Sequence, residues 1–261
     1  MTPDARDARD ARRAALEREL GEPITLDGLT ARWKLLQRKH GHRHSTDDVL
    51  TAWYALEQAP GVMHALDLGT GIGGVGLLVL SGLAETAELT CIEAQDISFR
   101  LLTENIAVNE LAARVHPLHG DLRDLRLAER FALITGSPPY FPESAGIVPA
   151  DSQKAHARFE LRGDLTDYAR TAERHLAADG TYVFCFPWQQ HARALATGGD
   201  QLGIASFRAV IPRAGAEPLF AVYACRRGTH RPVEEPPFVV RDAAGTHTEM
   251  YRAMRRRFGW E

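Results

Sequence analysis

One short segment constrains the fold of this chain more than any other: a glycine-rich turn between a predicted strand and a predicted helix. The strand is His64–Leu68, the turn begins at Asp67-Leu68-Gly69-Thr70-Gly71, and an apolar helix from Val75 to Leu83 follows. Glycines at such a turn let the backbone reverse tightly and approach a bound ligand without a Cβ clash. The unit therefore predicts a nucleotide-like ligand bound at the end of a strand.

Strands and helices alternate along the chain after this turn, which favours a largely parallel sheet covered on both faces. Further strands are predicted at Glu88–Glu93, Val115–Leu118, Phe131–Thr135 and Thr181–Phe186, an antiparallel hairpin at Ser206–Ile211 and Leu219–Cys225, and helices at Asp96–Leu111 and Leu165–Ala178, the last ending at Asp179-Gly180. We expect an α/β fold with a doubly wound, mostly parallel seven-stranded sheet and the hairpin at its edge. Residues 1–58 are predicted to form a helical, basic N-terminal extension to an α/β domain at residues 59–261.

Composition excludes several other classes of protein. The chain has 261 residues, and its apolar stretch at Val75–Leu80 is far too short to span a bilayer. Its N-terminus is charged, which argues against a secretory signal. The three cysteines are too scattered for a disulfide framework or a zinc site. We therefore expect no metal site, buried free thiols and a cytoplasmic location.

Acidic residues stand at the carboxyl ends of three successive predicted strands. Asp67 would repel a pyrophosphate but attract a cationic amino group, and Glu93 lies where a carboxylate can accept from both ribose hydroxyls. Asp121 would lie on the same rim, because ligands of such sheets bind outside the carboxyl ends of the strands. Asp121 or Asp124 could equally be a helix N-cap. A purely structural turn would explain the glycines but not the acids.

The tetrad Ser137-Pro138-Pro139-Tyr140 ends the fourth predicted strand on the same rim. Together with Asp67-Leu-Gly-Thr-Gly, Glu93 and Asp121, it resembles the class I S-adenosylmethionine methyltransferases that act on planar nitrogens. Within that class the sequence is most similar to the bacterial tRNA1(Val) adenine-N6 methyltransferases. The similarity includes the flanks Gln37–Arg43 and Asp242–Tyr251, so it extends over nearly the whole chain.

The resemblance implies a Rossmann-like methyltransferase fold and S-adenosylmethionine as cofactor. The implied cofactor-binding residues are Asp67, Gly69, Thr70, Gly71, Glu93 and Asp121, and the implied catalytic residues are Ser137, Pro138 and Tyr140. An exocyclic amine is a poor nucleophile because its lone pair is delocalised. The Ser137 hydroxyl oxygen and the Pro138 carbonyl would accept its two hydrogens, and Tyr140 would stack on the ring.

The resemblance makes adenine N6 in a tRNA the expected methyl acceptor. The family usually has Asn where this chain has Ser137, so a small heteroaromatic metabolite or a protein glutamine is the alternative acceptor. A non-catalytic RNA-binding relative is the third interpretation.

The net charge of −3 is the sum of two basic segments and a more acidic remainder of the chain. Residues 29–44 contribute +5 and residues 252–258 contribute +4, which removes the argument from composition against a nucleic-acid partner. Arg38, Lys39 and Arg43, with Tyr140 and Phe141, are the predicted substrate contacts. A solvated basic helix face at residues 32–43 is the competing interpretation. Residues 155–160 are predicted to lie as a lid over the substrate.

Overall fold

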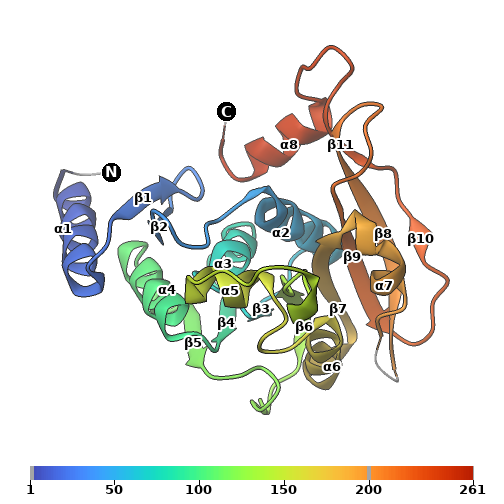
Figure 1. Ribbon diagram of the computed structural model, residues 1–261, viewed down its shortest axis with the longest axis horizontal. Coiled ribbons are helices and arrows are strands. Elements are labelled where there is room, and N and C mark those ends of the chain that lie inside the picture. The colour runs from blue at the N-terminus through green and yellow to red at the C-terminus, as the bar shows by residue number, and fades with distance from the viewer. Residues whose placement is uncertain (1–2, 199–200, 261) are drawn as a thin grey trace.

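The computed structural model describes residues 3–198 and 201–260, and nine strands in these residues form one sheet (Figure 1). The strands of this sheet are β3 (His64–Leu68), β4 (Glu88–Glu93), β5 (Val115–His119), β6 (Phe131–Gly136), β7 (Leu176–Pro187), β8 (Leu202–Arg213), β9 (Phe220–Arg227), β10 (Val233–Glu234) and β11 (Phe238–Arg241). Their order is β10-β8-β9-β7-β6-β3-β4-β5, with β11 also beside β8. Neighbours from β5 to β7 are parallel, and β9 is antiparallel to both β7 and β8.

The predicted mostly parallel sheet with an antiparallel hairpin is therefore confirmed, but the described residues form nine strands where seven were predicted, and the difference lies at the edge beside the hairpin. The hairpin of β8 and β9 is not the edge, because β10 and β11 pair in parallel with β8. β10 is only two residues long, so its sequence carries no strand periodicity. These short strands cover an edge that would otherwise expose unpaired backbone groups.

Helices cover both faces of the sheet (Figure 1). The helices after the N-terminal hairpin are α2 (Thr46–Gln58), α3 (Gly74–Ser81), α4 (Asp96–Val108), α5 (Ser152–Arg158), α6 (Leu165–His175), α7 (His191–Leu195) and α8 (Glu249–Arg257). Alternate residues of a strand point to opposite faces, so Ala65 packs in the core beneath α2 and α3 while Leu66 packs in the core beneath α6. The sheet thus separates two apolar cores.

The predicted end of α6 at Asp179-Gly180 is wrong. The helix ends at His175, and β7 begins at the next residue. The register between β6 and β7 shifts near this point, and a Cβ at Gly180 would lie 2.8 Å from the Phe131 carbonyl oxygen. Gly180 therefore allows two strands to approach closely where their register shifts. In the sequence alone, a glycine with this role looks the same as a glycine that ends a helix.

The N-terminal extension contains a hairpin as well as the predicted helices. α1 spans Pro3–Leu20, and β1 (Ile24–Gly28) pairs antiparallel with β2 (Lys34–Arg38). The alternative that residues 32–43 form a basic helix face is therefore wrong, because Lys34–Arg38 in this segment is the strand β2. Amide side chains of α4 bind the backbone of β2: Asn105 pairs with both backbone groups of Leu36, and Asn109 does the same for Lys34.

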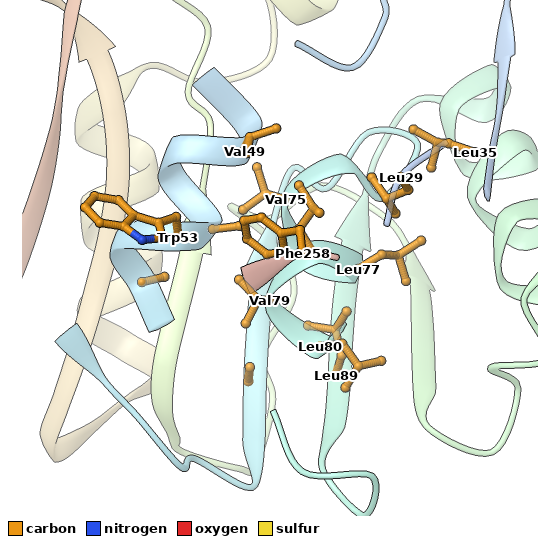
Figure 2. Close-up of a cluster of buried hydrophobic side chains, with 14 of the residues drawn as sticks. Leu29, Leu35, Val49, Trp53, Val75, Leu77, Val79, Leu80, Leu89 and Phe258 are labelled. Carbon is orange, nitrogen blue, oxygen red and sulfur yellow. The ribbon is translucent and has the colours of Figure 1, made fainter. Parts of the chain in front are cut away.

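The extension and the C-terminus share one apolar core with the α/β domain. Figure 2 shows Phe258, which follows α8, among side chains of α2 and α3, with Leu29 and Leu35 of the extension nearby. The predicted domain boundary at residue 58 coincides with the end of α2. No described helix is long and apolar enough to cross a membrane. All three cysteines are buried and free, as predicted.

Candidate functional site

The glycine turn after β3 is held in a backbone conformation that favours glycine. Gly69 and Gly71 each have φ of 59°, in the left-handed region. A Cβ on Gly69 would lie 2.0 Å from the hydroxyl oxygen of Tyr168, a residue of α6. A Cβ on Gly71 would instead meet no atom within 4 Å. Gly69 thus permits Tyr168 to pack closely against the turn, and Gly71 faces open space beside it.

Asp67 lies beneath this turn and is 1% exposed. Its carboxylate accepts hydrogen bonds from the Thr70 hydroxyl at 2.6 Å, the Thr135 hydroxyl at 2.7 Å and the Gly76 backbone N–H at 3.0 Å. Burial raises the pKa of Asp67 to about 6, against the lowering effect of these hydrogen bonds. Asp67 therefore fixes the turn directly and adds a negative charge behind it when ionised.

Glu93, at the end of β4, faces the same turn. One of its carboxylate oxygens accepts from Gly71 N–H at 2.8 Å and the other from Gln95 N–H at 2.7 Å. Burial raises the pKa of Glu93, opposed by these backbone donors. A carboxylate can accept about four hydrogen bonds, so each oxygen keeps capacity for a ligand hydroxyl.

Asp121 follows β5 on the same rim and is paired with Arg123. The guanidinium donates to both carboxylate oxygens, at 2.9 and 2.6 Å, and lowers the pKa of Asp121. The Arg123 backbone N–H also donates to this carboxylate at 2.9 Å. Asp121 therefore caps a turn, and the alternative of a helix N-cap at Asp121 or Asp124 is wrong, because residues 122–130 contain no helix.

These groups line a first cavity, which we call the cofactor cavity. Its wall includes Asp67, Gly69, Thr70, Gly71, Glu93 and Asp121, which the structure brings together as predicted, and also Gln95, His156 and Tyr168. The Gln95 amide nitrogen and the His156 Nδ1 are buried without a hydrogen-bond partner in the structure. Buried acids, a turn open at Gly71 and two unpartnered polar atoms fit a cationic ligand with several polar groups, as S-adenosylmethionine is.

The tetrad after β6 lies beside a second cavity, which we call the acceptor cavity. Ser137, Pro138, Tyr140 and Phe141 line it on one side, His42, Arg43, Asp47 and Asp48 on another, and Lys154 and Arg158 of α5 complete it. Ser137, His42, Arg43, Asp48 and Ala157 also line the cofactor cavity. The two cavities therefore share a wall at Ser137.

The tetrad is fixed by groups distant in sequence. The Tyr140 hydroxyl donates to the Asp47 carboxylate at 2.6 Å and lies 3.2 Å from the Cys185 sulfur, which is 3.8 Å from the Ser137 hydroxyl oxygen. Burial, with the neighbouring Cys185 and Asp47, raises the pKa of Tyr140 well above its usual value, so the hydroxyl remains a donor. No described residue donates a hydrogen bond to the Pro138 carbonyl.

The predicted substrate-binding cations are not equivalent in the structure. Arg38 is only 13% exposed and forms ion pairs with Glu22 and Asp151. Arg43 lines both cavities, although it also pairs with Asp27 at 2.9 Å. Lys39 is exposed and lines neither cavity.

The segment at residues 155–160, predicted as a lid, includes part of α5, and α5 borders both cavities. His156 and Ala157 line the cofactor cavity, and Ala157 and Arg158 line the acceptor cavity. The Arg158 carbonyl accepts from the backbone N–H groups of Tyr140 and Phe141. This part of the chain is therefore tied directly to the tetrad.

Sequence reasoning did not identify several residues of the site. Asp47 lies in the first turn of α2, whose N-cap is Ser45, and an acidic residue is common at that place in any helix. Gln153 accepts from His42 N–H at 3.1 Å and from Arg38, and thereby ties α5 to the extension. Nothing local in the sequence marks Gln153 or Cys185, because their partners lie in other elements.

Comparison with known proteins agrees with this geometry. The Methyltransferase small domain family matches residues 54–183, which contain the glycine turn and the tetrad. A tRNA1(Val) (adenine(37)-N6)-methyltransferase from Actinobacillus pleuropneumoniae is 25% identical over 74% of this chain and 80% of its own length. A solved structure described as a predicted O-methyltransferase from Agrobacterium tumefaciens superposes with a TM-score of 0.64 at 20% identity, over 83% of this chain and 98% of the other.

A solved structure from Listeria monocytogenes, described as a putative class I S-adenosylmethionine-dependent methyltransferase, is also similar in fold. Its TM-score is 0.55 at 13% identity, over 97% of this chain and 79% of the other. With the cavity and the tetrad, these findings place the chain among the class I S-adenosylmethionine-dependent methyltransferases. The protein is therefore an enzyme rather than the non-catalytic relative considered above. Its similarity to the tRNA1(Val) adenine-N6 methyltransferases is the resemblance that the sequence suggested.

Proposed function

We propose that this enzyme transfers a methyl group from S-adenosylmethionine to the N6 atom of an adenine in a tRNA. The strongest support is the wall at Ser137 that the cofactor and acceptor cavities share. A planar base in the acceptor cavity can reach that wall, and the base of a single-stranded RNA loop can be splayed out into such a pocket. The printed name of the Actinobacillus relative specifies the same acceptor atom.

The tetrad would orient the acceptor nitrogen. When bound, the cofactor supplies an electrophilic methyl group. The Ser137 hydroxyl oxygen and the Pro138 carbonyl would accept the two amino hydrogens and direct the nitrogen lone pair toward the cofactor cavity. Proline fixes the backbone dihedral, so this direction is set before the substrate binds. The nitrogen would release a proton to solvent after the transfer, so the site needs no strong general base.

The acids of the cofactor cavity would bind S-adenosylmethionine. Glu93 has acceptor capacity for ribose hydroxyls, and the open side of Gly71 leaves room for them. Asp67 and Glu93, when ionised, would favour a cationic sulfonium over the neutral product, which would aid exchange. Asp121 lines the same cavity and would accept from the purine of the cofactor.

The decisive experiment is methyl transfer to bulk tRNA, followed by mass spectrometry of the nucleosides. We expect label from S-adenosylmethionine to appear as N6-methyladenosine, and Ser137→Ala to lower kcat roughly tenfold to a hundredfold through loss of one acceptor. Ser137→Asn, which restores the usual family residue, is the matched variant and should retain activity. Label only in a small heteroaromatic metabolite or in a protein glutamine would contradict the tRNA assignment and leave the methyltransferase class intact.

A further inference from the structure

A group of four arginines and one histidine at the C-terminal end of the chain takes no part in the site described above. We call it the C-terminal basic cluster and define it as Arg241, His247, Arg252, Arg255 and Arg256. All of these except Arg241 line a cavity together with Gly259 and Trp260. Arg241 belongs to the same group, because it pairs with His247 in an antiparallel β-bridge. Loss of solvent contact and the charges of Arg241, Arg255 and Arg252 lower the pKa of His247.

Positive charge in this cluster exceeds the acid that neutralises it. Arg252 and Arg256 share a single carboxylate, that of Glu249, and are themselves 46% and 58% exposed. Exposed ion pairs of this kind contribute only about 0–1 kcal/mol, so an incoming phosphate can compete for both guanidinium groups. The cluster is thus a surface with spare affinity for anions.

Planar side chains accompany these cations. The ring of His247 lies 4.4 Å from that of Tyr251, and the Arg255 guanidinium lies over the Trp260 ring at 5.8 Å. Arginine and aromatic planes side by side bind both the phosphates and the bases of a nucleic acid. A surface built in this way suits an RNA strand better than a simple anion.

The sheet brings Arg241, at the end of β11, to the edge that holds the active site. The other arginines of the cluster lie on α8, which extends from β11 toward the end of α2, where Arg257 donates to the Leu56 carbonyl. β8 and β11 run parallel to β6 and β7, so Arg241 at the end of β11 and the tetrad after β6 stand at the same edge. Four inter-strand steps separate β6 from β11, through β7, β9 and β8. At about 4.8 Å per step this lateral span is roughly 19 Å, and the paired registers also place Arg241 about six residues beyond Gly136 along the strands. Arg241 therefore lies at least about six nucleotides of a stacked strand from the tetrad, at about 3.4 Å each.

We propose that the C-terminal basic cluster is a second RNA-docking surface, which binds phosphates of the substrate at least about six nucleotides from the methylated base. This inference rests on the proposed tRNA substrate and extends it to a part of the RNA outside the acceptor cavity. The cluster acts on affinity for long RNA and takes no part in the transfer step.

The test combines two variants of the protein with two lengths of RNA. Arg252→Gln/Arg256→Gln removes two exposed charges, and we expect KM for tRNA to rise about tenfold with kcat unchanged, while the salt dependence of binding weakens by one to two counterions. An oligonucleotide of about seven nucleotides centred on the target adenine cannot reach the cluster, so its KM should not change. Glu249→Gln, which removes the competing carboxylate, should tighten tRNA binding.

Arg226→Gln/Arg231→Gln is the matched control, with the same loss of charge at exposed positions. Arg226 lies near the end of β9, which is antiparallel to β7, and therefore at the opposite edge of the sheet. An unchanged KM for tRNA in the Arg252/Arg256 variant, or an equal rise in the control, would overturn the proposal. Binding measured by fluorescence anisotropy distinguishes the failure of one proposal from the failure of the other. Methylated tRNA whose affinity is unchanged in the Arg252/Arg256 variant contradicts only the docking surface, whereas tRNA that is not methylated contradicts the proposed function.

Discussion

The two cavities that meet at Ser137 are held in shape by different kinds of contact. In the cofactor cavity several partners of the acids are close in sequence: Asp67 binds Thr70 three residues on and Gly76 nine residues on, and Glu93 binds Gln95 two residues on. The other partners, Thr135 of Asp67 and Gly71 of Glu93, belong to neighbouring strands of the sheet and their turns. In the acceptor cavity, Tyr140 binds Asp47 at a separation of 93 residues. The acids of the first cavity are thus held by turns and neighbouring strands, and the tetrad beside the second by a contact with the extension.

This difference separates features that related chains can share from features that are particular to this chain. The proposed cofactor site consists of a turn and two acids that bind nearby groups of the fold, so any chain that preserves them can preserve that site. The acceptor cavity takes one wall from His42–Asp48 and another from α5, so its shape depends on the packing of distant elements. Substrate choice should therefore respond to changes at extension residues that line the acceptor cavity alone, such as Asp47, and these should leave cofactor binding intact.

The largest expected effect is on the cofactor side, from Glu93→Ala. This change removes the partner of the Gly71 and Gln95 N–H groups together with the acceptor for ribose hydroxyls. We expect the Kd for S-adenosylmethionine to rise about a hundredfold, or roughly 3 kcal/mol, by isothermal titration. Glu93→Gln keeps one carbonyl acceptor and should lose less affinity for S-adenosylmethionine than Glu93→Ala. Unchanged affinity in a folded Glu93→Ala protein would show that Glu93 does not hold the cofactor.

A smaller effect is expected on the acceptor side, from Asp47→Ala. Its loss leaves the buried Tyr140 hydroxyl without its acceptor, and we expect kcat to fall about tenfold with cofactor affinity unchanged. Asp47→Asn retains an acceptor oxygen and should recover most of the activity. Because Asp47 would act through Tyr140, the double variant with Tyr140→Phe should be no worse than the poorer single variant. Additive losses would show that Asp47 acts in another way.

The same contrast explains which parts of the structure the sequence predicted. The glycine turn, the parallel strands and the grouping of Asp67, Glu93 and Asp121 follow from local periodicity and from the rule that such sites lie at strand ends. The β1–β2 hairpin was missed because its basic residues resemble a helix face, and its edge is bound by Asn105 and Asn109 of a distant helix. Single-sequence patterns do not contain contacts of that range.

The smallest expected effects concern Arg38 and Lys39, two neighbouring residues that were both predicted as substrate contacts. Arg38 donates to Asp151 at 2.7 Å and also pairs with Glu22, and these carboxylates raise the pKa of its guanidinium despite partial burial. A phosphate would have to displace two carboxylates to reach it. We therefore expect Arg38→Ala to lower the free energy of unfolding by about 2 kcal/mol, as removal of a hydrogen-bonded charge does, with tRNA affinity changed less than about threefold.

Lys39→Ala is the matched control for this last experiment. Its side chain is exposed and lines neither cavity, so the free energy of unfolding in urea should change by less than about 0.5 kcal/mol. A tenfold loss of tRNA affinity in stably folded Arg38→Ala would instead place that guanidinium against the RNA. The ion pairs to Glu22 and Asp151 would then be contacts that the substrate displaces, and the extension would bind RNA directly as well as shaping the acceptor cavity.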